Sequence, residues 1–272
     1  MGHLAAQESD FSFDPKSKSV IPKFLGKVLL LKGEANATND NGEDRGLKIG
    51  DKLFLDDVVK TNPYSYLKIE MVDSSLITLG PNSEMKFDKF DYRTKEDRES
   101  VYNLLKGQMR SQFLVKAKKD EAIKVKAGMI SMGVRGTEFV VNSNKNANGE
   151  TISEVLLLEG KIHLYDKATK KEWNMKPKDH YVSITGGDTQ GIQSQMDDET
   201  FEKIKGPSLD PRRHFTPLLS FYELNRVVVK EPTRKKGRAP ASVDTVAAED
   251  YTPTRSWKST LNELNNRLRE ND

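Results

Sequence analysis

The side chains that most often carry out chemistry in proteins are few and scattered in this sequence. Its four histidines, His3, His163, His180 and His214, include no pair at the spacing of a metal site. The absence of cysteine excludes disulfides, thiolate nucleophiles, cysteine-ligated zinc and iron–sulfur clusters. The motifs of serine hydrolases, P-loop NTPases and dinucleotide-binding enzymes do not occur. We therefore expect neither a metal nor a cofactor.

Acidic side chains form two short groups, Asp56-Asp57 and Asp197-Asp198-Glu199. Neither shows the alternating carboxylates and glycine of a calcium loop, so solvated turns explain them better. Carboxylates are abundant, but no spacing singles out a pair for general acid–base catalysis. We predict that the protein is not an enzyme. An enzyme with a shallow carboxylate site is the least favoured interpretation.

The charge of the chain is nearly balanced, with 44 Lys and Arg against 41 Asp and Glu. This balance argues against a nucleic-acid-binding protein, whose charge is usually lopsided. The basic run at 234–238 has no interleaved aromatic residues and favours a solvated linker over a site for nucleic acid or anionic lipid. No stretch of about eighteen apolar residues occurs, so we expect no transmembrane segment.

The last part of the chain differs in composition from the rest. Six of the 11 prolines lie in residues 206–272. We predict an extended C-terminal arm at 194–272, in which apolar clusters at 215–222 and 227–229 dock back on the domain, the second as an edge strand. A short amphipathic helix is predicted near 256–270. Its apolar stripe, which would pack on the domain, on a second copy or on another protein, consists of Trp257, Leu261, Leu264 and Leu268.

Residues 24–193 predict an all-β domain, because short aliphatic and β-branched runs alternate with glycine and turn signals. Strands are expected at 27–31, 57–60, 66–72, 75–79, 122–126, 138–142, 154–158 and 181–184. The run 94–107 has helix-like spacing and predicts a helical turn. The fold class is a twisted β-solenoid or β-roll of short strands, or a bent β-sandwich.

An aliphatic run, one charged residue and a glycine recur three times along the predicted domain. The glycines are Gly33, Gly107 and Gly160, and the runs that precede Gly33 and Gly160 are nearly identical. A glycine at such a point lets a strand turn a corner without steric cost. The recurrence indicates strands wound in a coil or in stacked layers, with chance similarity of leucine-rich pieces as the alternative.

The strongest local motif is a pair of glycines around Val-Arg that runs directly into an apolar strand. It consists of Gly133, Val134, Arg135, Gly136, Thr137, Glu138 and Phe139. The guanidinium of Arg135 has five N–H donors to satisfy. We expect it to form a buried clasp to backbone carbonyls of a neighbouring strand, with Glu138 as a second partner. The alternative is that Arg135 holds a partner peptide or a ligand.

Between residues 24 and 190, several motifs taken in order resemble the FecR domain, the periplasmic sensing part of bacterial iron-uptake regulators. They are Gly26-Lys27-Val28, Leu47-Lys48-Ile49-Gly50-Asp51-Lys52-Leu53, Val58-Val59-Lys60-Thr61, Ser65-Tyr66-Leu67, Leu79-Gly80-Pro81-Asn82-Ser83, Leu105-Lys106-Gly107, Gly133 to Phe139, and Leu158-Glu159-Gly160. Asp56-Asp57 stands where the pattern has Gly-Asp, and Asp73-Ser74-Ser75 where it has Asp-Gly-Ser, which leaves these turn types open. The resemblance implies this domain type and an envelope location.

The sequence therefore favours a non-enzymatic, periplasmic FecR-like protein of a Gram-negative bacterium. Its expected role is protein–protein interaction or signal relay, with another envelope protein or a second copy bound by strand addition. A glycan- or peptidoglycan-binding cell-wall module is the alternative. Aromatic residues aligned on one exposed face would favour glycan binding, and the candidates are Tyr64, Tyr66, Phe87, Phe90 and Tyr92. Residues 1–23 are interpreted as an extension with tag residues, left after removal of a signal peptide.

Overall fold

The computed structural model describes residues 11–14, 19–146, 148–186 and 189–205. The predicted helix near 256–270, with Trp257, Leu261, Leu264 and Leu268, lies outside the described residues, as do the clusters at 215–222 and 227–229. In the described part of the chain, no helix has the length and hydropathy needed to cross a membrane.

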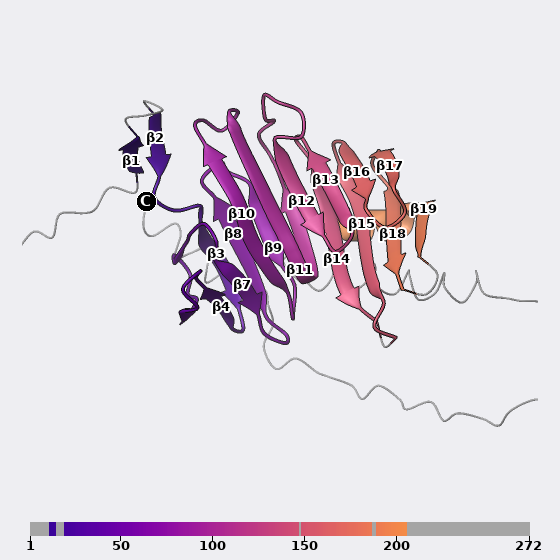
Figure 1. The fold of residues 1–272 in the computed structure, drawn as a ribbon, viewed down its shortest axis with the longest axis horizontal. Helices are drawn as coiled ribbons and strands as arrows, with labels where there is room; N and C mark the ends of the chain where they lie inside the picture. Colours follow the sequence, from indigo (N-terminus) through magenta and orange to yellow (C-terminus); the bar gives the residue numbers. More distant parts are fainter. Residues whose placement is uncertain (1–10, 15–18, 147, 187–188, 206–272) are drawn as a thin grey trace, which may run out of the picture. The chain divides into compact units, whose positions relative to one another are not determined.

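The fold is all-β, as predicted (Figure 1). Its strands form two sheets that share the long strand β11 (Arg98–Gln112). Sheet I has the order β6 (Lys52–Leu53), β3 (Gly26–Lys32), β8 (Tyr66–Met71), β9 (Leu76–Leu79), β11, β14 (Glu138–Lys145), β15 (Thr151–Glu159), β18 (Asp179–Thr185) and β19 (Gln190–Gln195).

Sheet II has the order β5 (Asp44–Gly46), β4 (Ala35–Thr38), β7 (Val58–Thr61), β10 (Glu84–Tyr92), β11, β12 (Ile123–Ala127), β13 (Ile130–Val134), β16 (Ile162–Asp166) and β17 (Lys171–Met175). Neighbouring strands are antiparallel except β11 and β12, which are parallel. A separate hairpin, β1 (Phe11–Asp14) and β2 (Ser19–Pro22), lies in the predicted N-terminal extension. The single described helix, α1 (Asp198–Lys205), follows β19.

One apolar core contains the inward side chains of both sheets. Leu67, Ile69 and Met71 of β8 are buried together, as their alternation predicted. Aromatic rings continue through this core from Phe87 to Tyr102, Phe113 and Phe139, with centroid separations of 6.1, 5.6 and 6.2 Å. The two sheets are therefore two layers over a shared interior.

The helical turn predicted at 94–107 is wrong, because residues 98–107 form the first part of β11 and residues 94–97 are a bend before it. Its side chains alternate between core and outer face: Tyr102 and Leu104 are fully buried, whereas Leu105 is exposed. The leucine pair that resembled a helical stripe thus lies on two faces of a strand. Pairing with β10 and β12 on both sides overrides the local helical spacing.

The three repeated glycines are corners between the sheets, which confirms the interpretation of the repeat. At Gly33 the chain leaves β3 of sheet I for β4 of sheet II, and at Gly160 it leaves β15 for β16. At Gly107, β11 itself passes from sheet II to sheet I. The φ angles are +78°, +88° and +91°, in the left-handed region that only glycine adopts at low cost.

The chain also passes between the two sheets through a second kind of corner, a four-residue turn. This turn recurs six times within the described residues. Its third residue has positive φ, and its fourth is Asp, Ser or Thr. The turns are 48–51, 54–57, 62–65, 80–83, 134–137 and 176–179. In the first, the Lys48 N–H donates to the Asp51 carboxylate over 2.7 Å. Asp56 adopts φ 68° where the family pattern has glycine, so the substituted turn keeps its conformation.

Candidate functional site

The motif at 133–139 is one of these turns followed by strand β14. Arg135 is at the second position of the turn, where the side chain points outward and is 46% exposed. Its Nη1 lies 2.6 Å from Oδ1 of the exposed Asp120. Thr137, the fourth residue, donates its hydroxyl to the carbonyl of Lys161 over 3.0 Å and so joins this turn to the Gly160 corner. The prediction that Arg135 forms a buried clasp is wrong, because the turn directs its side chain into solvent.

Glu138 is likewise not a partner of Arg135. Its carboxylate accepts a hydrogen bond of 2.7 Å from Nε of Arg110, on the adjacent strand β11. Phe139 is fully buried in the aromatic series, and Val134 also faces the core. The motif therefore positions a corner and anchors two strands, and it leaves only Arg135 exposed at its tip.

A buried arginine clasp of the expected kind exists at Arg98, at the start of β11. Both its side chain and that of Asp73 are 0% exposed, and Nε lies 2.5 Å from Oδ2 of Asp73. Nη2 donates to the carbonyl of Val115 over 2.8 Å, and Nη1 donates to the carbonyl of Lys95. This clasp fixes the 113–122 connection against the β8–β9 turn. Sequence reasoning missed it because its two charges are far apart along the chain.

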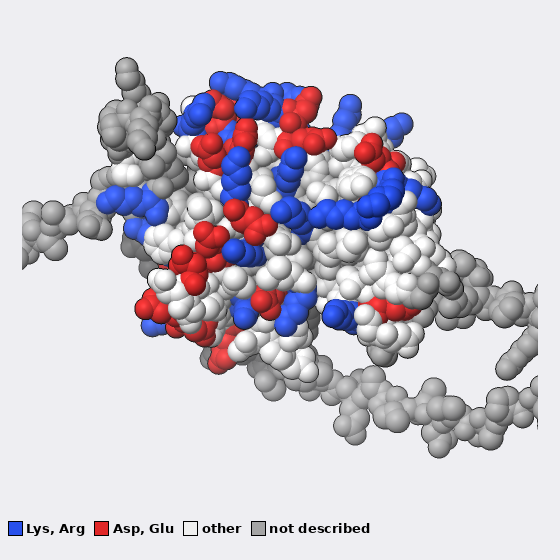
Figure 2. Space-filling model, in the orientation of Figure 1, with Lys and Arg blue, Asp and Glu red and all other residues white. Residues whose placement is uncertain are grey.

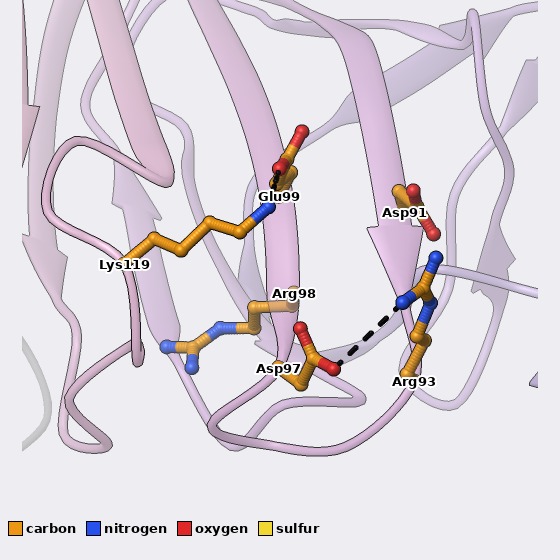
Figure 3. A pocket seen from close by; sticks show the side chains of 6 residues that line it. All are labelled: Asp91, Arg93, Asp97, Arg98, Glu99 and Lys119. Atoms are coloured by element: carbon orange, nitrogen blue, oxygen red, sulfur yellow. Dashed lines mark hydrogen bonds and ion pairs between the residues drawn. The ribbon is translucent and has the colours of Figure 1, made fainter.

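A shallow groove next to this clasp is lined by ionisable side chains alone (Figure 3). It is lined by Asp91, Arg93, Asp97, Arg98, Glu99 and Lys119. Two of its acids pair with bases: Asp97 lies 4.0 Å from Arg93, and Glu99 lies 3.0 Å from Lys119. The ammonium groups of Lys89 and Lys119 hydrogen-bond to Glu99 and lower its pKa to about 2. Glu99 is therefore ionised at neutral pH and unsuited to donate a proton as a general acid.

The lowered pKa of Glu99 predicts how this residue responds to acid. Because its folded-state pKa lies below the unfolded value, Glu99 stabilises the fold above pH 4.5, and this contribution disappears as the pH falls toward 2. In a carboxyl-resolved NMR titration we expect Glu99 to titrate near 2, and Lys89→Ala with Lys119→Ala to return it toward 4.5. A titration near 4.5 in the unsubstituted protein would contradict the paired geometry.

Of the two acidic groups singled out in the sequence, Asp197-Asp198-Glu199 is exposed as expected, whereas Asp57 is buried. Asp57 is 1% exposed, and its Oδ1 accepts a hydrogen bond of 3.0 Å from Nη1 of Arg45. Asp197 precedes α1 and caps it, since its Oδ1 accepts the N–H of Thr200 over 2.9 Å. This backbone hydrogen bond lowers the pKa of Asp197. Both groups are thus structural parts of turns or helix ends.

In the face shown in Figure 2, acidic and basic side chains are mixed over the left part, and a row of basic side chains crosses the right part. Across the outer side of sheet II, Glu84 lies between Lys60 and Lys106 at 3.6 and 3.5 Å, and Lys126 lies 3.2 Å from Asp88. Alternating ion pairs of this kind leave no continuous basic strip on these strands. The arrangement agrees with the balanced composition and gives a phosphate backbone little to bind there.

The aromatic residues that would favour glycan binding do not lie on one exposed face. Tyr66 and Phe87 are buried, at 4% and 0% exposure, whereas Tyr64 is 87% exposed on a turn. Phe90 and Tyr92 stack on each other, with ring centroids 6.1 Å apart. Stacking surfaces for sugars need several exposed rings in register, and these five residues do not provide one.

The open end of the two sheets is the candidate interaction site. Within the described residues, β19 pairs with β18 alone and β17 pairs with β16 alone, so each presents one free backbone edge. β19 is six residues long and has no charged side chain (Gln-Gly-Ile-Gln-Ser-Gln). At the opposite end, β5 has three residues with Asp44 and Arg45, and β6 has two. Short, charged edges resist pairing with other chains, whereas β19 lacks these protective features.

Strand β19 is held in place by a buried polar network. His180 of β18 is 1% exposed; its Nδ1 lies 3.0 Å from Ser194 Oγ and its Nε2 lies 2.6 Å from Glu154 Oε1. Asn142 donates to the second oxygen of Glu154 over 3.2 Å. Ser, His and Glu in this order resemble a nucleophile, base and orienting acid, but burial closes the His180 ring off from a substrate. The network instead fixes the free edge to β14, β15 and β18.

These features define a class of protein: an all-β domain wound through tight, polar-capped corners between two sheets. Residues 57–163 match the family model described as FecR protein. The resemblance drawn from the sequence motifs is thereby confirmed. The two described histidines, His163 and His180, lie on strands, and each is hydrogen-bonded.

Three solved structures show how far the likeness extends. A structure described as a cell surface anchoring domain is 30% identical, with 22% of this chain and 80% of that chain covered and a TM-score of 0.22. Two crystal structures are described as a candidate anti-sigma factor from Parabacteroides distasonis ATCC 8503. One is 12% identical over 58% of this chain and 74% of that chain, with a TM-score of 0.43. The other is 13% identical over 77% and 91%, with a TM-score of 0.44. The comparison with curated proteins yields no match.

Proposed function

We propose that the protein is a non-enzymatic signal-relay module of the bacterial cell envelope. In this proposal it lies in the periplasm of a Gram-negative bacterium and binds another envelope protein through the open end at β17 and β19. The match of residues 57–163 to the FecR family model supports a role in signal transduction. The proposal keeps 24–193 as the sensing domain and 194–272 as the arm, whose described part is the end of β19 and α1.

The observation that carries the proposal is the free edge of β19. An added strand would satisfy its outward N–H and C=O groups and continue sheet I by one strand, which is a common way for proteins to bind extended peptides. Because Ser194 is bonded to His180, the edge is already held in strand geometry before a partner arrives. Binding to a preformed edge loses less conformational entropy than binding to a segment that must first become ordered.

A lysine placed on this edge tests the mechanism. Gln193 is exposed, and its register partner Tyr181 is a core residue, so the side chain at 193 points toward the interior side of the edge. An inward charge on an edge strand opposes strand addition. We expect Gln193→Lys to weaken partner binding at least about tenfold, which corresponds to about 1.4 kcal/mol. Asn103→Lys, in the middle of sheet II, is the matched control and should bind normally.

The partner for this measurement comes from photo-crosslinking at position 195 in the native organism, followed by its purification and titration against both variants. Equal affinity of Gln193→Lys and Asn103→Lys would overturn strand addition at β19. Sedimentation with isolated cell-wall sacculi tests the glycan alternative, and strong co-sedimentation would replace the proposed function. Fractionation of the organism tests the periplasmic location, which recovery in the cytosolic fraction would contradict.

A further inference from the structure

The outer face of sheet I carries one continuous row of side chains that α1 covers in part. Following the strand registers from β3 to β19, the row consists of Leu30, Lys68, Thr78, Arg110, Val140, Leu156, His180 and Ser194. Val140, Leu156 and Leu158 are buried in one apolar cluster with Phe201 and Ile204 of α1, and Met196 and Tyr66 of β8 belong to the same cluster. The covered part of the face therefore includes β14, β15 and the start of β8 at Tyr66, and the remaining part lies over β9, the rest of β8 and β3.

The direction of α1 sets where the chain goes next. At its start, Lys178 bonds to Asp198 over 2.5 Å beside β18. At its end, Nη1 of Arg110 on β11 donates to the carbonyl of Ile204 over 2.9 Å, and Nη2 donates to that of Lys205 over 3.3 Å. The helix thus crosses sheet I from β18 to β11, and Arg110 fixes its carboxyl end. The last described residue, Lys205, thus lies over β11, and β9, β8 and β3 are the next strands of sheet I.

Exposed apolar side chains lie at the far end of this face. Leu29 and Leu30 of β3 are 46% and 40% exposed, and a break in register between Val28 and Leu30 makes β3 bulge there. Ile49, 65% exposed, belongs to the turn whose Gly50 N–H donates to the carbonyl of Val28. Large apolar side chains gathered at one strand mark a surface that another segment covers.

We propose that residues 215–222 of this chain bind the outer face of sheet I at β8 and β3, with their leucines and aromatic rings on Leu29 and Leu30. The segment reads Phe-Thr-Pro-Leu-Leu-Ser-Phe-Tyr. From β11 to β3 is three strand spacings, about 14 Å. The residues between Lys205 and Phe215 can span about 33 Å when extended, so the segment reaches the site with slack. Tethering also gives it an effective concentration in the millimolar range, which favours it over a free partner.

This docking is independent of strand addition at β19, because it uses another face of the sheet. With this docking, the first part of the arm would cross sheet I from α1 to β3. An occupant from outside the chain would have to displace a tethered segment first.

The absence of native cysteine allows a direct test in the full chain. Leu30→Cys with Leu218→Cys should form an intramolecular cross-link with a short bismaleimide. Leu105→Cys with Leu218→Cys is the matched control, because Leu105 is 45% exposed but lies on the outer face of sheet II. We expect the first pair to cross-link at least about tenfold faster than the second. The reason is that docking of residues 215–222 keeps position 218 close to position 30 and away from position 105. Equal rates would overturn the proposal, and so would cross-links between two molecules, which would indicate a second copy on this face.

A second measurement does not depend on the cross-linker. In the Leu30→Cys protein, maleimide labelling of the thiol should accelerate when Leu218→Asp and Leu219→Asp are added, because charged side chains would not remain on the apolar face. The same two aspartates should leave labelling of Leu105→Cys unchanged. Labelling of Leu30→Cys that the aspartates do not alter would contradict docking.

Discussion

Replacing Arg98 with methionine is expected to lower the free energy of unfolding by about 3–5 kcal/mol, the usual cost of removing one partner of a buried ion pair. Without the guanidinium, Asp73 keeps a carboxylate that is 0% exposed and has lost its counter-charge. The carbonyls of Val115 and Lys95 lose their donors as well. Urea denaturation monitored by the intrinsic fluorescence of the protein measures the change, and the loss should appear as a lower midpoint with an unaltered slope.

Arg135→Met is the matched control for this prediction. Its guanidinium pairs with Asp120, which is 83% exposed, and exposed pairs contribute about 0.2–1 kcal/mol. We therefore expect Arg135→Met to unfold near the midpoint of the unsubstituted protein. Equal losses for the two substitutions would show that the clasp is not at Arg98. A double variant with Asp73→Leu should recover part of the loss, because it removes the carboxylate left without a partner.

Alanine at Gly107 is the second substitution with a large expected effect. The residue has φ +91°, and a Cβ there would overlap the backbone Cα and the side chain of Ser83. Relieving the overlap requires the 80–83 turn to move away from β11, so we expect a loss of about 4 kcal/mol or more, or failure to fold. Thermal and urea unfolding of the purified variant measure this loss.

Gly50→Ala separates the strain of the backbone from the overlap. Gly50 has φ +90°, nearly the same as Gly107, but a Cβ at this position meets nothing within 4 Å. We expect a cost of about 1–2 kcal/mol, which is the penalty of the left-handed conformation alone. If Gly107→Ala costs no more than Gly50→Ala, then the corner is not tightly packed against Ser83, contrary to the structure.

The corners of this fold, which depend on a few consecutive residues, could be predicted from the sequence. The contacts between residues far apart in the chain could not. Glycines, and Asp or Ser at the ends of turns, indicate the corners in the sequence, because these residues favour turn conformations in any context. The pairing of Arg98 with Asp73 depends on the register of β11 and on the path of residues 113–122. Neither is encoded in a short window, so the clasp was expected at Arg135, whose flanking glycines made it conspicuous.

The candidate site shows the same division. Strand addition was expected from exposed edges, but the strand that provides the edge was not predicted, because Gln190 to Gln195 contains one aliphatic residue and no aromatic residue. Its strand geometry comes from β18 and from the bond between Ser194 and His180. Likewise, the acidic start of α1 resembles a solvated turn in the sequence. The helix is stabilised by the packing of Phe201 and Ile204 on apolar side chains of sheet I, which the local sequence does not indicate.

The sharing of β11 by both sheets has a consequence for how the native protein opens. Every described strand pairing between the part of the chain before β11 and the part after it passes through this strand, which pairs with β9, β10, β12 and β14. If either half fluctuates open, the other still covers one side of β11. Its amide protons should therefore exchange with deuterium more slowly than those of any neighbour, at rates set by global unfolding. The strand that joins the layers is also expected to be the last to lose its structure.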